Sequence, residues 1–164
     1  MVPSVSAVTP EWHHYRAYGL HITSEVPFPS FVPASPGGPD LTIRCRQVDC
    51  LDDWRVKGRT VYASPATTRA GEPYLRVVLP EEPGAAPWLL RHTGDAGVVD
   101  FLLHTASPHI DLRVKGHVPD LEREAYFTGA VLGHTFRLRG QTCLHGGFLA
   151  WKDGAVGVVG PKGA

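Results

Sequence analysis

The sequence predicts an α+β fold with a β-rich N-terminal region, one long helix over about residues 120–138, and a C-terminal β-hairpin. Three observations predict it. Short apolar runs with strand-like alternation, separated by glycine and proline, fill the first two thirds of the chain. A single helical pattern with start and stop signals follows, and two apolar runs then flank Asp153-Gly154. We therefore expect a β-rich region over 1–115 and a helix with a hairpin over 116–164.

Composition and charge narrow the class of protein. The chain carries 16 basic and 16 acidic residues, so no single-sign field favours nucleic acid or a membrane surface as a partner. No apolar run has the length of a membrane span, and no secretory signal pattern is visible. Cys45, Cys50 and Cys143 do not suit a disulfide framework. We expect a cytoplasmic protein whose cysteines are ordinary small residues.

The β-rich region divides into short strands. A proline-rich connection, residues 24–40, is expected to cross an edge or an end of the sheet because proline cannot donate a ladder hydrogen bond. Clusters of turn-forming residues separate the later runs. Strands are expected at 15–23, 41–48, 73–79, 97–103 and 109–114.

The helix has a predicted beginning and end. Asp120 follows Pro119 and is expected to be the N-cap, with acidic residues in the first turn facing the positive end of the helix dipole. Gly140 is placed for the C-terminal cap. One apolar stripe is expected to face the core, and its members are Leu121, Ala125, Thr128, Leu132 and Phe136.

The apolar run after the hairpin turn leads into a glycine-rich sequence. A phosphate-binding loop has the pattern Gly, four residues, Gly, Lys, then Ser or Thr. Residues 160–164 supply the first five places, so Lys162 holds a variable position and is not the catalytic lysine. In such a loop, backbone N–H groups surround the phosphate oxygens, and glycine permits the required dihedral angles. The candidate nucleotide-binding residues are Gly160, Pro161, Lys162, Gly163 and Ala164.

Three segments of the chain resemble HPr kinase/phosphorylase and its relatives. TCLHGGFLAWKDGAVGVVGPKGA, residues 142–164, resembles their approach to the P-loop, where a strand with Leu/Met-His-Gly/Ala, a hairpin turn and an apolar strand enter the Walker A loop. YRAYGLHITSEVPFPSF, residues 15–31, is similar to the opening of the HPr kinase-related proteins of bacteria. Residues 119–147 match the family's helix and following strand in layout. The resemblance covers both ends of the chain and leaves residues 49–100 outside it.

The resemblance implies a bacterial serine-kinase-like protein with a P-loop core related to phosphoenolpyruvate carboxykinase. The C-terminal hairpin would then begin a truncated P-loop kinase core. In that family the histidine of the Leu-His-Gly strand lies near the transferred phosphate, and the matching residue here is His145. The remainder of the Walker A loop and the downstream metal-binding acidic residues have no counterpart. We therefore expect the chain to be an N-terminal fragment.

The expected function is that of the N-terminal part of an ATP-dependent HPr kinase-like kinase that phosphorylates serine or another hydroxyl. ATP and Mg²⁺ would bind in the full-length protein, at residues 160–164 and beyond, and this chain by itself is expected to be inactive. The expected partners are a nucleotide and a protein or peptide phosphate acceptor, and the related kinases are often oligomers. The alternative is a complete, non-catalytic β-rich module that binds a peptide or a protein.

The sequence does not predict a metal site. No pair of the other eight histidines shows ligand spacing on an expected element. His104 and His109 flank a proline turn, and nothing in their spacing predicts that their side chains meet. The eight are His13, His14, His21, His92, His104, His109, His117 and His134.

Overall fold

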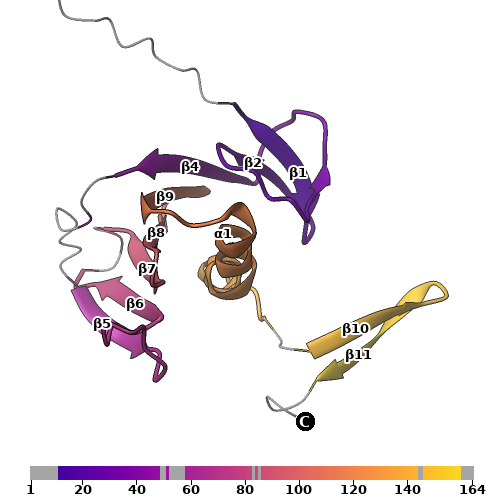
Figure 1. Ribbon diagram of the computed structural model, residues 1–164. Coiled ribbons are helices and arrows are strands. Elements are labelled where there is room, and N and C mark those ends of the chain that lie inside the picture. The colour runs from indigo at the N-terminus through magenta and orange to yellow at the C-terminus, as the bar shows by residue number, and fades with distance from the viewer. Residues whose placement is uncertain are drawn as a thin grey trace, which may run out of the picture.

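The computed structural model describes residues 11–48, 51, 58–82, 84, 86–143 and 146–159, without the side chain of Phe148. In these residues the fold is mixed α/β and strand-rich, with one large sheet, a two-stranded hairpin and one helix of 19 residues. The large sheet curves around the helix, which covers one of its faces (Figure 1). None of the described helices is long and apolar enough to span a membrane.

Nine strands of the described chain form the large sheet, in the order β3-β1-β2-β4-β9-β8-β7-β6-β5. The pairs β2–β4 and β4–β9 are parallel, and all other neighbours are antiparallel. The strands are β1 (His13–Ala17), β2 (Leu20–Ser24), β3 (Val32–Pro33), β4 (Leu41–Gln47), β5 (Gly58–Ala63), β6 (Leu75–Pro80), β7 (Trp88–Thr93), β8 (Gly97–Leu103) and β9 (His109–Gly116).

The prediction of one strand over 15–23 is wrong, because the chain reverses in the middle of that segment. β1 and β2 are joined by the dipeptide Tyr18-Gly19 and pair in an antiparallel manner. Tyr18 has φ 53° and Gly19 has φ 75°, so both residues of the turn adopt the left-handed region that a tight hairpin requires. Gly19 supplies this conformation easily, whereas tyrosine rarely does.

The strands expected at 41–48, 97–103 and 109–114 are confirmed as β4, β8 and β9, and the one expected at 73–79 is β6. The sequence analysis missed β3, β5 and β7. β7 contains Trp88-Leu89-Leu90, an apolar run without strict alternation, and lies between two clusters of turn residues. Both of its faces are largely buried, so a periodic pattern is absent.

The helix occupies the predicted range and consists of α1 (Asp120–Tyr126), the π-helical segment η1 (Phe127–Val131) and α2 (Leu132–Leu138). The predicted N-cap is wrong by one residue. Pro119 is the N-cap, no side chain caps the helix there, and Asp120 is the first helical residue. The Asp120 carboxylate instead pairs with Arg123 one turn later.

The predicted C-terminal cap is confirmed. Gly140 has φ 75°, and its N–H donates to the carbonyl of Arg137. The N–H of Gln141 donates to the carbonyl of Phe136. These two hydrogen bonds form a Schellman motif, with Gly140 in the left-handed position.

The predicted core-facing stripe of the helix is wrong in its first half, because Leu121 is 63% exposed and Ala125 is exposed. Its second half is confirmed at Leu132, which is buried, and at Phe136, which packs against the core. The buried residues lie on a stripe shifted by one position, and they are Glu124, Phe127, Val131, Leu132 and Thr135. The helix carries apolar residues on both stripes, and Phe127 is the largest fully buried side chain of the observed one. Its ring stacks on Phe28 with centroids 4.9 Å apart.

The core lies between this face of the helix and the sheet. The sheet contributes alternate residues of its central strands, because successive strand side chains point to opposite faces. The largest fully buried members include Phe28, Leu90, Phe101, Leu103 and Leu112.

The C-terminal hairpin is confirmed. β10 (Gly146–Trp151) and β11 (Gly154–Val159) pair in an antiparallel manner and lie beyond the helix, apart from the large sheet (Figure 1). The predicted turn is wrong by one residue. Lys152 and Asp153 form the two-residue loop, Lys152 has φ 52°, and Gly154 is already in the strand.

Candidate functional site

The residues that the sequence analysis assigned to catalysis and nucleotide binding lie outside the described residues. These are His145, Gly160, Pro161, Lys162, Gly163 and Ala164. The structure describes the elements that lead to them. Helix α2 ends at Leu138, and β11 ends at Val159, the residue directly before the glycine-rich sequence.

The described residues contain a different cluster of ionisable side chains, at the turn between β8 and β9. β8 ends at Leu103 and β9 begins at His109. The N–H of His104 donates to the carbonyl of His109 at 3.3 Å, so these two residues face each other across the hairpin. Asp111 lies two residues after His109 and therefore on the same face of β9. Ile110 between them is buried in the core.

The three side chains contact one another directly. Nε2 of His104 lies 2.9 Å from Oδ2 of Asp111, and Nε2 of His109 lies 2.9 Å from Oδ1 of the same carboxylate. The two imidazole centroids are 5.4 Å apart. The side chains of His104, His109 and Asp111 are 33%, 22% and 26% exposed, so the cluster is half-buried and open to solvent. One carboxylate is thus held between two imidazoles.

The surroundings of Asp111 stabilise the negative charge of its carboxylate. Burial raises the pKa of a carboxyl group, but the hydrogen bonds from His104 and His109 and their charges act in the opposite direction. The balance leaves the pKa of Asp111 below its ordinary value. The cluster therefore combines a carboxylate with two imidazoles, and these groups are common ligands of transition metals.

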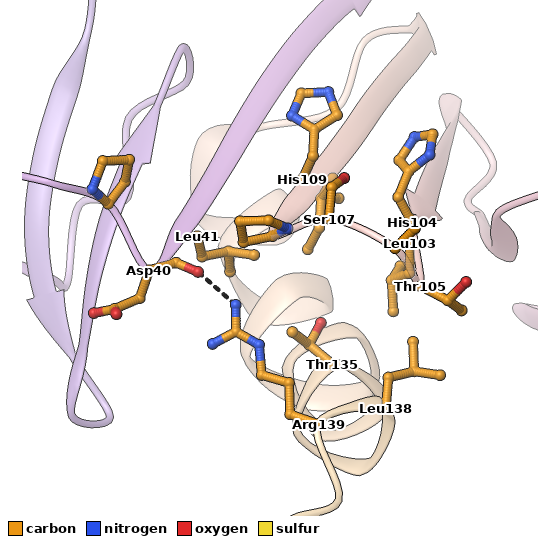
Figure 2. A pocket seen from close by; sticks show the side chains of 14 residues that line it. Asp40, Leu41, Leu103, His104, Thr105, Ser107, His109, Thr135, Leu138 and Arg139 are labelled. Atoms are coloured by element: carbon orange, nitrogen blue, oxygen red, sulfur yellow. Dashed lines mark hydrogen bonds between the residues drawn. The ribbon is translucent and has the colours of Figure 1, made fainter. Parts of the chain in front are cut away.

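A pocket of about 520 Å³ lies on the other side of the same turn, at the C-terminal end of the helix. Figure 2 shows the hydroxyl-bearing side chains of Thr105, Ser107 and Thr135 around it. Arg139 closes one side by donating a hydrogen bond to the carbonyl of Asp40.

The imidazoles do not enter this pocket. His104 and His109 contribute to its wall, but Figure 2 shows both rings directed away from the helix. The pocket and the cluster of His104, His109 and Asp111 therefore share a turn of backbone and face opposite sides of it. A molecule in the pocket would contact the turn and the helix end, whereas an ion at the cluster would lie on the outer face of the sheet.

The sequence analysis did not expect His104 and His109 to meet, and the structure brings them together. The missed signal is the arrangement His, four residues, His, one residue, Asp around a predicted strand–turn–strand unit. In an antiparallel pair the residues that flank the turn face each other, so these two histidines are neighbours if the loop has four residues. The register was not available from the sequence.

Comparisons with protein-family models, with curated proteins and with solved structures found no match to this chain.

Proposed function

We propose that this chain is the N-terminal part of an ATP-dependent, HPr kinase-like kinase that phosphorylates serine or another hydroxyl group in the cytoplasm. The observation that supports the proposal is the order of the C-terminal elements. A capped helix is followed by an antiparallel hairpin, and its second strand, β11, ends directly before Gly160-Pro161-Lys162-Gly163-Ala164. A strand that enters a glycine-rich loop is the arrangement of a P-loop.

The exposure of the hairpin also supports the proposal. Every residue of β11 is exposed, and Val156, Val158 and Val159 are 55%, 71% and 53% exposed. Leu149 and Trp151 of β10 are 74% and 66% exposed. An isolated two-stranded hairpin is marginally stable in water, and strands that are apolar on both faces are typical of a sheet covered on both sides. We propose that the rest of a nucleotide-binding core supplies that cover.

The chemistry of the proposed kinase would consist mainly of positioning and charge neutralisation. The backbone N–H groups of Gly160–Ala164 would bind phosphate oxygens, and His145 would lie near the transferred phosphate. Mg²⁺ would neutralise the phosphates when bound. Residues 160–164 supply the first five places of the loop pattern, and the second glycine, the lysine and the hydroxyl residue would complete it.

The test uses the chain extended by the residues that its reading frame encodes after codon 164. We expect Gly-Lys-Ser or Gly-Lys-Thr to follow directly, and the extended protein to bind ATP with Mg²⁺ and transfer phosphate. His145→Ala in the extended protein should lower phosphate transfer while nucleotide binding persists. His117→Ala, at an exposed position of the large sheet region, is the matched control and should leave both unchanged. A stop codon after Ala164, or turnover by the 164-residue chain, would contradict the proposal.

The exposed hairpin also favours a second candidate, a non-catalytic module that binds a peptide or a protein. The apolar strands β10 and β11 have unpaired outer edges within the described residues, and an extended peptide can add a strand to such an edge. A stop codon after Ala164, together with peptide binding that is lost in Val158→Asp, would favour this function over the kinase.

A further inference from the structure

We propose that His104, His109 and Asp111 form a binding site for a single Zn²⁺ ion, with three protein ligands and a fourth position open to solvent. The site belongs to the β8–β9 hairpin of the large sheet. It does not use the β10–β11 hairpin or the glycine-rich sequence. The zinc proposal is therefore independent of the proposed kinase function, and each can be tested without the other.

The first argument is convergence. The three donor atoms come from opposite sides of one hairpin, and all lie within 4.8 Å of one another. Donors around a tetrahedral zinc ion at ordinary bond lengths are about 3.4 Å apart. The distances from Nε2 of His104 and of His109 to the carboxylate are each 2.9 Å, which is shorter than this value. The side chains would therefore move apart by about 0.5 Å to admit the ion.

The second argument is the identity of the donors. Two imidazoles and one carboxylate are a common ligand set of zinc sites that keep an open coordination position. Both histidines present Nε2 to the cluster, and each would carry its remaining proton on Nδ1 when the ion is bound. The carboxylate of Asp111 is ionised at neutral pH, so one charge of the cation is neutralised on binding.

The third argument is rigidity. Leu103 and Ile110, which flank the two histidines in the chain, are 2% and 1% exposed and are anchored in the core. The backbone hydrogen bond between residues 104 and 109 fixes the distance between the two strands. A preformed pair of ligands loses little conformational entropy when the ion binds. Figure 2 shows the rings of His104 and His109 directed away from the helix, and the two side chains are 33% and 22% exposed to solvent.

The same contacts would also suit a cluster whose purpose is only to close the hairpin, with both imidazoles donating to Asp111. The two roles make different predictions. A cluster that only closes the hairpin does not bind Zn²⁺ stoichiometrically, whereas a metal site binds one equivalent of Zn²⁺ and is stabilised by it.

The test is a titration of the chelator-treated, reduced 164-residue protein with Zn²⁺ by calorimetry, and with Co²⁺ by visible absorption. We expect one ion per chain, a rise in melting temperature that saturates at one equivalent, and a Co²⁺ spectrum of low coordination number. His104→Gln, His109→Gln and Asp111→Asn should each weaken binding by more than about 100-fold. These substitutions keep polar side chains at the turn, and far-ultraviolet circular dichroism verifies that each variant folds.

Two controls separate this site from other zinc ligands on the chain. His117→Ala removes an exposed histidine, and Cys143→Ser removes an exposed thiol. Both variants should bind Zn²⁺ as the parent protein does. Absence of binding up to millimolar Zn²⁺ by the folded protein would overturn the proposal. Equal affinity of the parent protein and the His104→Gln and His109→Gln variants would overturn it as well.

Discussion

The imidazole of His92 lies flat against the phenol ring of Tyr126, with ring centroids 4.1 Å apart and planes inclined by 14°. His92 belongs to β7 and Tyr126 belongs to the helix, so this stack is a packing contact between the sheet and the helix that covers it. Phe101 contacts the same imidazole edge-on, at 6.0 Å. Nε2 of His92 has no hydrogen-bond partner in the part of the chain that the structure describes. This histidine therefore behaves as an aromatic core residue.

The burial of His92 predicts a pH dependence of stability. Burial lowers its pKa to about 4 in the folded protein, from 6.5. Between these values the unfolded chain binds a proton that the folded chain does not, so the free energy of unfolding falls as pH falls through this window. At pH 5 the loss from this residue should be about 2 kcal/mol relative to pH 8. Urea unfolding at the two pH values measures it.

A substitution at the same position isolates this effect from other titrating groups. Phenylalanine keeps the ring stack and has no titrating nitrogen. We expect His92→Phe to lose less stability than the parent protein between pH 8 and pH 5, by about 2 kcal/mol. His117→Ala, at an exposed histidine, should follow the parent protein. Parallel pH profiles for His92→Phe and the parent protein would show that His92 is not the responsible group.

The face of the helix can be tested with a pair of substitutions. Phe127 is fully buried and stacks on Phe28, whereas Leu121 is 63% exposed. Phe127→Ala should lower the free energy of unfolding by about 3–5 kcal/mol, because it leaves a cavity in the core. Leu121→Ala should change it by no more than about 0.5 kcal/mol. The midpoints of urea denaturation distinguish the two variants. A larger loss of stability in Leu121→Ala than in Phe127→Ala would mean that the stripe predicted from the sequence faces the core.

Glu124 connects the helix to the proline-rich connection. It is 7% exposed, and its Oε2 accepts a hydrogen bond from the N–H of Ser30 at 2.9 Å. Glu124→Ala should destabilise the protein by about 1–3 kcal/mol, because the amide of Ser30 loses its acceptor. Glu124→Gln keeps a carbonyl oxygen at the same place and should cost clearly less. Thermal unfolding of both variants at neutral pH provides the comparison, and equal losses would mean that the hydrogen bond does not contribute.

Some parts of this fold could be predicted because one local feature determined them. The alternation of β9, with Ile110, Leu112 and Val114 on the core face, is a strand pattern in the sequence and in the structure. The end of the helix was likewise predicted from one local feature, the glycine at position 140, which favours the left-handed conformation of a C-terminal cap.

Other parts depend on choices that a local pattern leaves open. Tyrosine at position 18 is not a turn signal, so the reversal between β1 and β2 was not visible. The helix offered two apolar stripes, and the packing against the sheet, including the stack of Phe127 on Phe28, selects the buried one. The cluster of His104, His109 and Asp111 depends on the register of β8 with β9, which a sequence without its partner strand does not specify.

The C-terminal cap of the helix gives a prediction in which the same substitution has opposite signs at two positions. Gly140 has φ 75° and no atom within 4 Å of an added Cβ, so the cost of Gly140→Ala comes from the backbone alone. We expect a loss of about 1–2 kcal/mol in the free energy of unfolding. Gly133 lies in α2 with ordinary helical backbone and equally open surroundings. Gly133→Ala should stabilise the protein by up to about 1 kcal/mol, because alanine has the higher helix propensity. Urea denaturation of the two variants beside the parent protein gives both values, and a Gly140→Ala variant as stable as the parent protein, or more stable, would contradict the Schellman assignment.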